Sequence, residues 1–379
     1  MTSSPTSHRY EDIAADTERQ AWIFLNHVPF IGPMRFHRLL RAAQSAAAIL
    51  KMSALELTQA EVGLDLAGHW KICFAESARW AAVEKECALE RRGLLRILTE
   101  LDQEYPETLR TVIDRPPVLY VQGKWPPPPQ RMIGIVGTRR ATPYGLYVAR
   151  EFSRTLAQRG MATVSGLAAG IDTAAHEATL QEKGFTIAVL GHGLQHRFPQ
   201  ANRRLFEKIG AEGALMTEFP YTMGPQATHF PRRNRIIAGL SDSIVVVEAG
   251  EKSGALITAR YAAEQGRDVF AVPGRLFQEA SRGCHRLIKE GAGLATGVED
   301  ILGIARAVKE DENPVLSATA PVSAEEKELL DALTEEPMTM DEIMARLGGS
   351  VDRWAESLLS LELRKLIYVL PGQRYGCDN

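Results

Sequence analysis

Cysteine is scarce in this sequence. The 379 residues contain four cysteines, Cys73, Cys87, Cys284 and Cys377, and none of them belongs to a C-x-x-C pair. Disulfide frameworks and structural zinc sites are built from several cysteines at regular spacings. We therefore expect reduced thiols and neither a disulfide framework nor a zinc site, which is typical of a protein in a reducing compartment.

Long apolar runs are also missing. The longest ones, such as Ile244–Val247, fall far short of the roughly 20 residues that a membrane-spanning helix needs. The first residues, Met1–Asp16, are polar and lack the apolar core of a signal peptide. The sequence predicts a cytoplasmic protein with no membrane partner.

Neither sign of charge dominates the whole chain, whose formal net charge at pH 7 is −3. Residues 1–130 carry 15 basic and 16 acidic side chains, whereas residues 131–305 carry 21 and 16, a net charge of +5. Residues 306–321 carry 2 and 3, and residues 322–379 carry 6 and 12, a net charge of −6. Because like charges repel, we expect a polyanion to bind the middle of the chain rather than its C-terminal part.

The length of the chain predicts more than one domain, since a domain usually has ~100–200 residues. Apolar positions recur at helical spacing from Thr17 to Arg92, with no alternating strand pattern. A run rich in Ala, Ser, Thr and Pro near residue 315 is typical of a linker. We predict a small helical domain at residues 1–93, an extended Rossmann-like domain at 94–305, a linker at 306–322 and a winged-helix-like domain at 323–379.

A turn in the N-terminal helical segment is similar to a helix-hairpin-helix, so this domain is expected to be of the SAM or helix-hairpin-helix type. Val28–Met34 forms the turn, and a helix from Arg35 to Arg41 follows it. Phe30 stands where that motif has its first glycine. Two interpretations stay open, a turn that grips a DNA backbone and a packing module of helices.

The middle of the chain alternates short apolar runs with helical patterns, which predicts an α/β fold. The runs are apolar at consecutive positions, as expected for strands of a parallel sheet that is covered on both faces. This is the pattern of a doubly wound, mostly parallel sheet. The expected strands are Leu94–Leu98, Pro117–Val121, Met132–Val136, Met161–Val164, Phe185–Leu190, Ala214–Glu218, Ser243–Val247 and Asp268–Val272.

The C-terminal segment has the pattern of a winged helix. Helices are expected at Ala324–Leu333, Thr339–Leu347 and Val351–Arg364, followed by a hairpin of Leu366–Leu370 with Arg374–Tyr375. Winged helices often bind duplex DNA through the third helix. Because this domain is acidic, a protein-docking role is the favoured alternative.

Three arginines and an aromatic residue cluster directly before a predicted buried strand, in Phe230–Ile237. Arginine offers a planar fork of donors to phosphate oxygens, and a phenylalanine ring offers a face on which an unpaired base can stack. The cluster predicts either a nucleic-acid groove or a solvated, charged start of a helix.

Glycine turns follow three of the predicted strands. They lie at Gly137–Arg140, Ser165–Gly170 and Gly250–Gly254. A glycine turn that opens a helix lets backbone N–H groups approach an anion, and turns at neighbouring strand ends meet in one crevice. We therefore expect one phosphate-binding crevice, with Arg139 as its clamp and Lys252 beside it.

Other chemistry finds little support in the same motifs. The first turn lacks the G-x-G-x-x-G spacing of a dinucleotide site, and Ser165 lacks the glycine of a G-x-S-x-G elbow. Asp172 and His176 fit a capped helix start better than a catalytic pair. His192 and His196 have no ligand cluster around them, so we expect no metal.

Taken together, these motifs resemble the DNA-processing protein A family (DprA, also called Smf). The resemblance covers roughly residues 94–303. It is carried by Gly137–Arg139, Ser165–His176, Phe198–Asn202, His229–Leu240, Glu248–Ala249, Ser253–Ala259 and Ala271–Gly274.

The resemblance implies a non-enzymatic protein without a cofactor that binds and protects single-stranded DNA and loads RecA recombinase onto it, in natural transformation or homologous recombination. It further implies a homodimer through the Rossmann-like domain. The implied nucleic-acid-binding residues are Gly137, Thr138, Arg139, Arg140, Ser165, Gly166, Gly170, Asn202, Phe230, Arg232, Arg233, Asn234, Arg235, Lys252, Ser253 and Gly254.

The chain departs from the family pattern in two places. Gln200 stands where family members often have a basic residue, and Ala227–Thr228 stand where some have a lysine. Either the affinity for DNA is lower, or Arg203, Arg232 and Arg233 compensate.

An enzyme on a related sheet is the alternative to a DNA-binding protein. Nucleotide phosphoribohydrolases of the lysine-decarboxylase-like group carry a P-G-G-x-G-T-x-x-E signature, which supplies a phosphate turn and a catalytic glutamate. Glu248–Gly254 occupies the comparable region here and does not match that signature.

Overall fold

The computed structural model describes residues 6–60, 77–128, 130–303, 323–364, 366–370 and 374–377. They belong to two compact units, Met1–Ala305 and Arg306–Asn379. The predicted linker at 306–322 and Cys73 lie outside the described residues. The domain boundaries drawn from the sequence remain predictions.

Helices from the N-terminal segment pack on the antiparallel edge of the central sheet. Trp22, Phe24 and Phe36 belong to the same buried cluster as Tyr120 of the sheet and Phe206 of a covering helix. The helical spacing in the sequence therefore gives helices, and their apolar faces share one core with the sheet. The helices are α1 (Thr6–His27), α2 (Pro33–Ala43), α3 (Ala46–Ile49), α4 (Ala54–Gln59) and α6 (Ser77–Arg91).

The predicted helix-hairpin-helix turn joins α1 to α2. Phe30 adopts φ 69°, the left-handed backbone conformation that favours glycine, and its side chain is exposed. Arg35 Nη1 donates a hydrogen bond of 2.9 Å to the Phe30 carbonyl oxygen, which supports the turn. The backbone thus has the bend of the motif without its glycine, and DNA contact by this turn remains a prediction.

A nine-stranded sheet forms the centre of the first unit, in the order β1-β2-β6-β5-β4-β3-β7-β8-β9. The strands from β6 to β9 run parallel, and β1 and β2 are added antiparallel at one edge. This confirms the predicted mostly parallel, Rossmann-like sheet. The strands are β1 (Arg96–Thr99), β2 (Val118–Gly123), β3 (Met132–Val136), β4 (Ala162–Ser165), β5 (Thr186–Val189), β6 (Ala214–Thr217), β7 (Ser243–Val246), β8 (Asp268–Ala271) and β9 (Gly293–Leu294).

The chain winds away from β3 in both directions. The strands β4, β5 and β6 follow on one side of β3, and β7, β8 and β9 follow on the other. Val136 at the end of β3 lies opposite Val246 at the end of β7. The loops after these two strands diverge from this point, and such a switch point leaves a crevice at the carboxyl ends of the strands.

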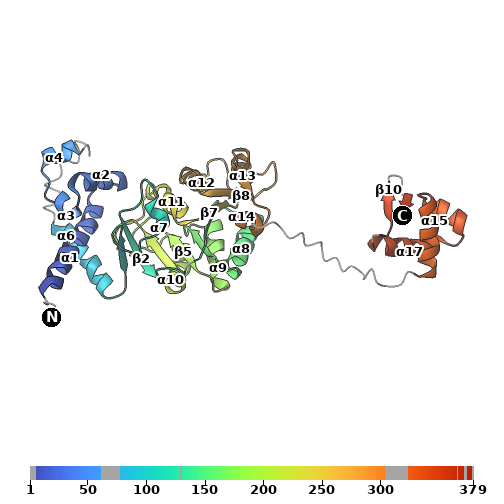
Figure 1. Cartoon of the computed structure of the whole chain (residues 1–379), viewed down its shortest axis with the longest axis horizontal. Helices are drawn as coiled ribbons and strands as arrows, with labels where there is room; N and C mark the ends of the chain where they lie inside the picture. Colours follow the sequence, from blue (N-terminus) through green and yellow to red (C-terminus); the bar gives the residue numbers. More distant parts are fainter. Residues whose placement is uncertain are drawn as a thin grey trace. The chain divides into compact units, whose positions relative to one another are not determined.

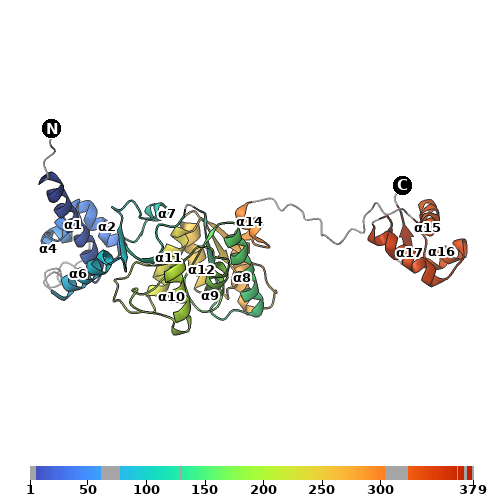
Figure 2. The ribbon, with the colours of Figure 1, turned by 90° about the horizontal axis from the view of Figure 1, so that it is seen from below.

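Helices cover both faces of the sheet, as consecutive apolar residues in the strands require. Figure 1 shows α11, α12 and α13 on one side, and Figure 2 views the unit from the side of α8, α9 and α10. The described residues contain no helix with the length and apolar character needed to cross a membrane. The helices of this part are α7 (Glu107–Arg110), α8 (Pro143–Gln158), α9 (Ile171–Gln181), the 3-10 helix η1 (Gln200–Asn202), α10 (Arg203–Glu212), α11 (His229–Leu240), α12 (Ala255–Glu264), α13 (Glu279–Lys289) and α14 (Val298–Leu302).

The C-terminal unit has three helices and a hairpin around its own core. They are α15 (Ala324–Glu335), α16 (Met340–Leu347), α17 (Val351–Leu363), β10 (Tyr368–Leu370) and β11 (Arg374–Gly376). Trp354 and Leu361 of α17 are buried with Leu329 of α15 and Ile343 of α16. This agrees with the predicted winged-helix pattern.

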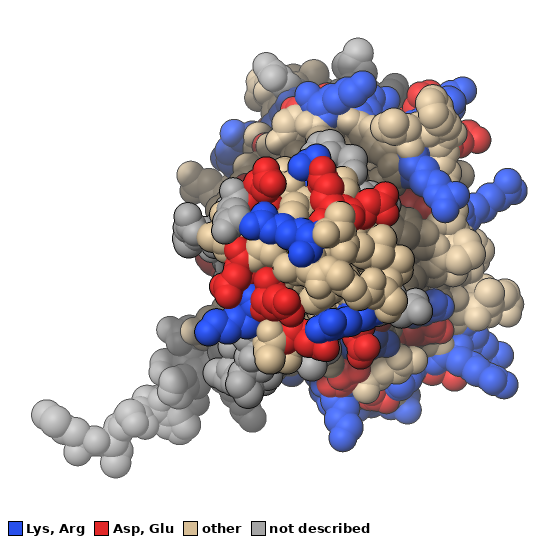
Figure 3. All heavy atoms as spheres, turned by 90° about the vertical axis from the view of Figure 1, so that its right-hand side faces the viewer, with Lys and Arg blue, Asp and Glu red and all other residues tan. Residues whose placement is uncertain are grey.

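Three arginines of the C-terminal unit form ion pairs within it. Arg353 lies 3.1 Å from the Glu325 carboxylate, Arg364 lies 3.1 Å from that of Glu326, and Arg374 lies 3.3 Å from that of Glu342. Figure 3, which looks onto this unit, shows acidic and basic side chains around an uncharged area. Acidic partners thus neutralise these three arginines.

A buried histidine makes the first unit sensitive to acid. His176 on α9 is fully buried, and its Nδ1 lies 2.7 Å from Thr186 Oγ1. Desolvation, with a smaller contribution from Arg233, lowers the pKa of His176 to about 3. The ring must therefore become protonated when the protein unfolds in mild acid.

Above pH 6.5, His176 should not affect the free energy of unfolding. At lower pH values, we expect the free energy of unfolding to decrease. The folded pKa is below the unfolded one, so each pH unit between about 6.5 and 3 costs about 1.4 kcal/mol. Urea denaturation at pH 7 and pH 5 measures the effect. His176→Gln should reduce the slope of the wild type, and His196→Gln, at a half-exposed ring, should keep it; equal slopes for His176→Gln and the wild type would contradict the assignment.

Candidate nucleic-acid interface

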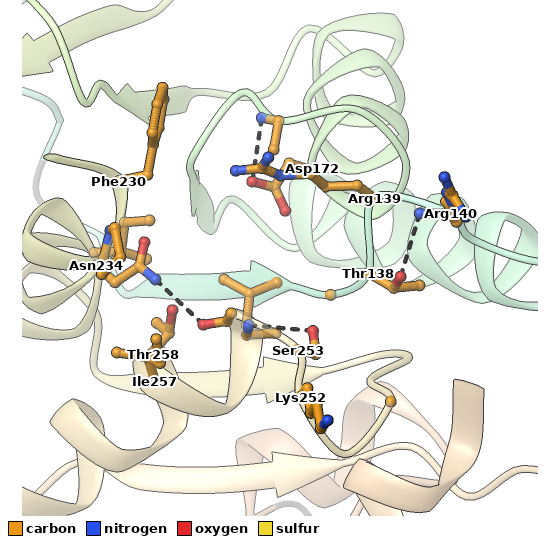
Figure 4. Close-up of a pocket in the computed structure, with 18 of the residues that line it drawn as sticks. Thr138, Arg139, Arg140, Asp172, Phe230, Asn234, Lys252, Ser253, Ile257 and Thr258 are labelled. Carbon is orange, nitrogen blue, oxygen red and sulfur yellow. Dashed lines mark hydrogen bonds between the residues drawn. The ribbon is translucent and has the colours of Figure 1, made fainter. Parts of the chain in front are cut away.

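A cavity of about 760 Å³ opens where β3 and β7 diverge, at the carboxyl ends of the strands. We call it the switch-point cavity; Figure 4 shows it between the loop after β3, the loop after β7 and the start of α11. Its lining residues are Val136, Gly137, Thr138, Arg139, Arg140, Ala168, Asp172, Ala227, Phe230, Pro231, Arg233, Asn234, Ile237, Gly250, Glu251, Lys252, Ser253, Gly254, Ala255, Ile257, Thr258, Glu279 and Arg282.

The loop after β3 is held against β7 by the backbone. Thr138 N donates a hydrogen bond of 2.7 Å to the Glu248 carbonyl oxygen. At Gly137 a Cβ atom would lie 2.5 Å from Ile171 Cγ1, which is closer than real contacts allow. Glycine is therefore needed here so that the loop can pass between α9 and β7, and this fixes where Arg139 begins.

Arg139 faces the aromatic ring that the sequence singled out. Its guanidinium carbon lies 5.6 Å from the centre of the Phe230 ring. Figure 4 shows Arg139 extending from the loop after β3, with Phe230 standing across the cavity at the start of α11. In one cavity, a cation can bind the phosphate of a nucleotide while an aromatic ring stacks on its base.

Four cations of the cavity are exposed and form no ion pair with any described residue. They are Arg139, Arg140, Lys252 and Arg282. The cavity also receives the N-terminus of α12 through Gly254, whose carbonyl oxygen accepts a 3.3 Å hydrogen bond from Asn234 Nδ2. Unpaired cations and a helix N-terminus both attract anions.

Arg233 is a buried residue of the cavity lining that bonds to the loop after β4 and to the end of β5. Its Nη1 donates hydrogen bonds to the carbonyl oxygens of Gly166, at 2.7 Å, and of Val189. Burial lowers the pKa of Arg233 to about 10, and the side chain is still a cation at pH 7. Arg233 contributes positive charge to the cavity while these hydrogen bonds position the loop after β4.

Asp172 supports the same loop. Its Oδ2 accepts hydrogen bonds from the backbone N–H groups of Gly166, at 3.1 Å, and Ala168, at 3.3 Å. Burial raises the pKa of Asp172, and the charge of Arg233 and these hydrogen bonds oppose the rise. The carboxylate is engaged in shaping the loop.

The structure brings ten of the predicted residues into the cavity: Gly137, Thr138, Arg139, Arg140, Phe230, Arg233, Asn234, Lys252, Ser253 and Gly254. It leaves six others outside: Ser165, Gly166, Gly170, Asn202, Arg232 and Arg235. The sequence alone could not separate the two groups, because the separation depends on where the fold places each residue and, for all but the glycines, on the direction of its side chain.

Two of the residues outside the cavity are polar side chains engaged in buried hydrogen bonds. Ser165 Oγ donates a 2.6 Å hydrogen bond to the Ile135 carbonyl oxygen. Asn202 Nδ2 donates to the Leu167 carbonyl oxygen at 3.0 Å and to Thr173 Oγ1 at 2.8 Å. Ser165 thus ties β4 to β3, and Asn202 supports the loop after β4.

Two arginines of the α11 cluster point away from the cavity. Arg235 is 2% exposed and donates two hydrogen bonds, of 2.9 and 2.8 Å, to the Glu218 carboxylate. Arg232 donates a 2.9 Å hydrogen bond to the same carboxylate. One turn of a helix separates Arg232 and Arg235, so both reach Glu218, and neither is offered to a phosphate in the cavity.

The sequence did not reveal the wall that α13 contributes. Glu279 and Arg282 line the cavity about thirty residues after Lys252, and both are exposed. The predicted strand Asp268–Val272 before them is confirmed as β8, so its loop was known to end at the same sheet edge. The sequence did not predict the orientation of α13, which places Glu279 and Arg282 at that edge.

The histidines that follow β5 are held by carbonyl oxygens. His192 Nε2 lies 3.2 Å from the Phe198 oxygen, and His196 Nε2 lies 3.0 Å from the Thr222 oxygen. Within the described ranges, no group of three or more His, Cys, Asp or Glu residues is arranged to hold a metal ion.

The fold and the cavity together define a class: a Rossmann-like protein with unpaired cations and an aromatic ring at its switch point, followed by a winged helix. Residues 96–306 match the family model of DNA recombination-mediator protein A, and residues 313–373 match that of the DprA winged helix domain. The chain belongs to the DNA recombination-mediator protein A family. The family predicted from the sequence motifs is thereby confirmed.

Curated relatives cover most of the chain. It is 38% identical to protein Smf of Escherichia coli K12 over 344 residues, which are 89% of this chain and 88% of that protein. It is 37% identical to protein Smf of Synechocystis sp. PCC 6803 over 314 residues, which are 73% of this chain and 79% of that protein.

Solved structures of two family members resemble this chain. The X-ray structure of DNA processing protein A from Streptococcus pneumoniae aligns with a TM-score of 0.65 and 34% identity, covering 75% of this chain and 97% of that one. A structure of the Helicobacter pylori protein, described as revealing its single-stranded DNA binding mode, aligns with a TM-score of 0.50 and 28% identity, covering 55% and 94%.

A substitution at Gly170 can test whether the close approach of the loops after β3 and β4 positions Arg139. It adopts φ 82° and ψ −122°, a region open essentially to glycine alone, and a Cβ atom would overlap the Thr138 carbonyl oxygen. Gly170→Ala should lower the free energy of unfolding by about 1–3 kcal/mol and displace the loop that carries Arg139. Urea denaturation and DNA-binding titration measure the two effects.

Gly266→Ala is the matched control. Its φ of 69° is also positive, but a Cβ atom there would meet no other atom within 4 Å. This variant should lose about 1 kcal/mol of stability and keep its DNA affinity. Equal DNA affinity of both variants would show that the close approach at Gly170 does not position Arg139.

Proposed function

We propose that this chain binds single-stranded DNA in the switch-point cavity. The observation that carries the proposal is the arrangement of Arg139, Arg140, Lys252 and Arg282, four exposed cations without ion-pair partners among the described residues, around a cavity that also presents Phe230. The cations would hold the backbone phosphates. Phe230 would stack on a base.

The shape of the cavity favours a single strand over a duplex. A volume of about 760 Å³ is in the range of sites that hold small organic ligands, so an unpaired nucleotide fits inside it. In a duplex the base faces are covered by neighbouring base pairs and cannot reach Phe230. The Helicobacter pylori relative, whose structure is described by its single-stranded DNA binding mode, supports the same choice.

We further propose that the chain is not an enzyme and needs no cofactor. The carboxylate of Glu248, in the region comparable to the phosphoribohydrolase signature, accepts hydrogen bonds from Thr142 N and Thr142 Oγ1 at 2.9 and 2.5 Å. The Glu248 carboxylate therefore stabilises the N-terminus of α8. Asp172 is likewise engaged with backbone N–H groups, so neither carboxylate is free to act as a base.

The biological part of the proposal follows from the family. We propose that the protein acts in the cytoplasm as a homodimer through the Rossmann-like domain, protects single-stranded DNA and loads RecA recombinase onto it during natural transformation or homologous recombination. The match to a family described as a recombination mediator supports this role.

Binding to single-stranded and duplex DNA of equal length tests the proposal. The full chain should prefer the single strand, and Arg139→Ala should weaken binding and reduce the salt slope, log Kd against log salt concentration, by about 0.7, the value for one phosphate contact. Phe230→Ala should weaken binding by ~1–3 kcal/mol and leave the slope unchanged. Fluorescence anisotropy at several salt concentrations gives both quantities.

Arg260→Ala is the matched control for Arg139→Ala. Its side chain is 80% exposed and forms an ion pair with Glu264 on the same helix, outside the cavity lining. It removes the same charge and should leave binding nearly unchanged. Equal affinity for both DNAs, or equal effects of the two arginine variants, would reject the cavity as the binding site.

RecA loading and dimer formation are tested with the same variants. Light scattering should give twice the chain mass of 41.8 kDa. RecA filament assembly on single-stranded DNA should become faster with the full chain and not with Arg139→Ala, because loading requires the strand to be bound. A monomer in solution, or assembly unchanged by the wild type, would contradict these parts of the proposal.

A further inference from the structure

Phe198 lies just outside the switch-point cavity, in the loop between β5 and η1. Its side chain is 41% exposed, which is large for an aromatic ring, and it does not line the cavity. A single exposed apolar residue needs no explanation. The position of Phe198 is nevertheless informative, because its ring lies next to the ring of Phe230 inside the cavity.

The ring of Phe198 is placed next to that of Phe230. Their centres lie 5.7 Å apart and their planes are tilted by 40°. The guanidinium of Arg139 also lies over the Phe230 ring, at 5.6 Å from its centre. Because the two rings are tilted rather than stacked, Phe230 leaves part of the Phe198 ring open, in agreement with its exposure.

Buried groups hold Phe198 in this position. The ring of His192 meets that of Phe198 edge to face with centres 6.1 Å apart, and His192 Nε2 lies 3.2 Å from the Phe198 carbonyl oxygen. His192 is buried, and desolvation lowers its pKa, so the ring is neutral at pH 7. Gly191 provides room for Phe230, whose Cδ1 would lie 2.8 Å from a Cβ atom there.

Exposed cations lie close to Phe198 in the sequence. Arg197 directly precedes it and is exposed, with its guanidinium 5.7 Å from the centre of the Phe206 ring. Arg203 and Arg204 at the start of α10 are also exposed; Arg203 Nε forms an exposed ion pair with Glu207 at 3.3 Å, which a phosphate group can replace. An open aromatic face beside several exposed arginines is the combination that binds single-stranded nucleic acid.

We propose that Phe198 is a second stacking position, which receives the base of a nucleotide outside the cavity while Phe230 receives a base inside it. The bound strand would then leave the cavity over Phe198, with its phosphates near Arg197 and Arg203. The inference rests on the proposed binding of single-stranded DNA and extends that site by at least one nucleotide toward α10.

Substitutions that change only the ring test this role in the full chain. Phe198→Leu keeps apolar packing against Phe230 and removes the aromatic face, and it should weaken binding to oligo-dT about 5-fold to 150-fold, the range for one stacked base. The salt slope should not change, because no phosphate contact is lost. Phe198→Tyr should restore binding.

Tyr147→Ala is the matched control, since Tyr147 is a 63% exposed aromatic on α8 that does not line the cavity. It should bind oligo-dT as the wild type does. Direct contact is measured by photo-cross-linking oligonucleotides that carry 5-iodouracil at single positions, followed by mass spectrometry. We expect Phe198→Tyr to be cross-linked at residue 198, at a different nucleotide from the one that marks Phe230.

The outcomes separate this inference from the proposed function. If Phe198→Leu binds as tightly as the wild type, or residue 198 is not cross-linked, while Arg139→Ala and Phe230→Ala weaken binding, the second stacking position is wrong and the cavity stands. If none of these variants weakens binding, or duplex DNA binds equally well, both the inference and the proposed function fail.

Discussion

The close meeting of three backbone segments at the switch point determines the rest of the site. The Thr138 N–H bonds to the Glu248 carbonyl oxygen at 2.7 Å, and Gly137 and Gly170 leave no room for a side chain where the loops after β3 and β4 approach each other. Because this contact is made by backbone atoms, it leaves the side chain of Arg139 free. These backbone contacts hold the loops after β3, β4 and β7 in the positions that form the cavity walls.

Burial decides which arginines are available to a ligand. Arg235 is buried against Glu218 and Asp114, and Arg233 is buried against carbonyl oxygens, so desolvation is offset by partners inside the protein. Arg139 and Lys252 are exposed and have no ion-pair partner among the described residues. The same residue type thus either stabilises the fold or attracts an anion, depending on the direction in which the backbone presents it.

Much of the fold could be predicted because it follows from local patterns. Continuous apolar runs predicted eight strands of the sheet within a residue or two, and β3 matches Met132–Val136 at both ends. The two-residue strand β9 has too little pattern to be recognised. The predicted site contained Arg139 and Phe230, which the structure places 5.6 Å apart, and also Arg232 and Arg235, which it turns toward Glu218.

The sequence by itself determined the family, the order of the strands along the chain and the residue types that the site can use, since glycine turns, arginines and aromatic residues are readable one after another. Only the tertiary structure decided which of them meet. Arg282 comes from a helix far along the chain, and Phe198 reaches Phe230 from the loop after β5. Arg235, one turn of α11 away from Arg232, faces Glu218 and not the cavity. These outcomes depend on the angles between packed elements, and local sequence patterns do not contain those angles.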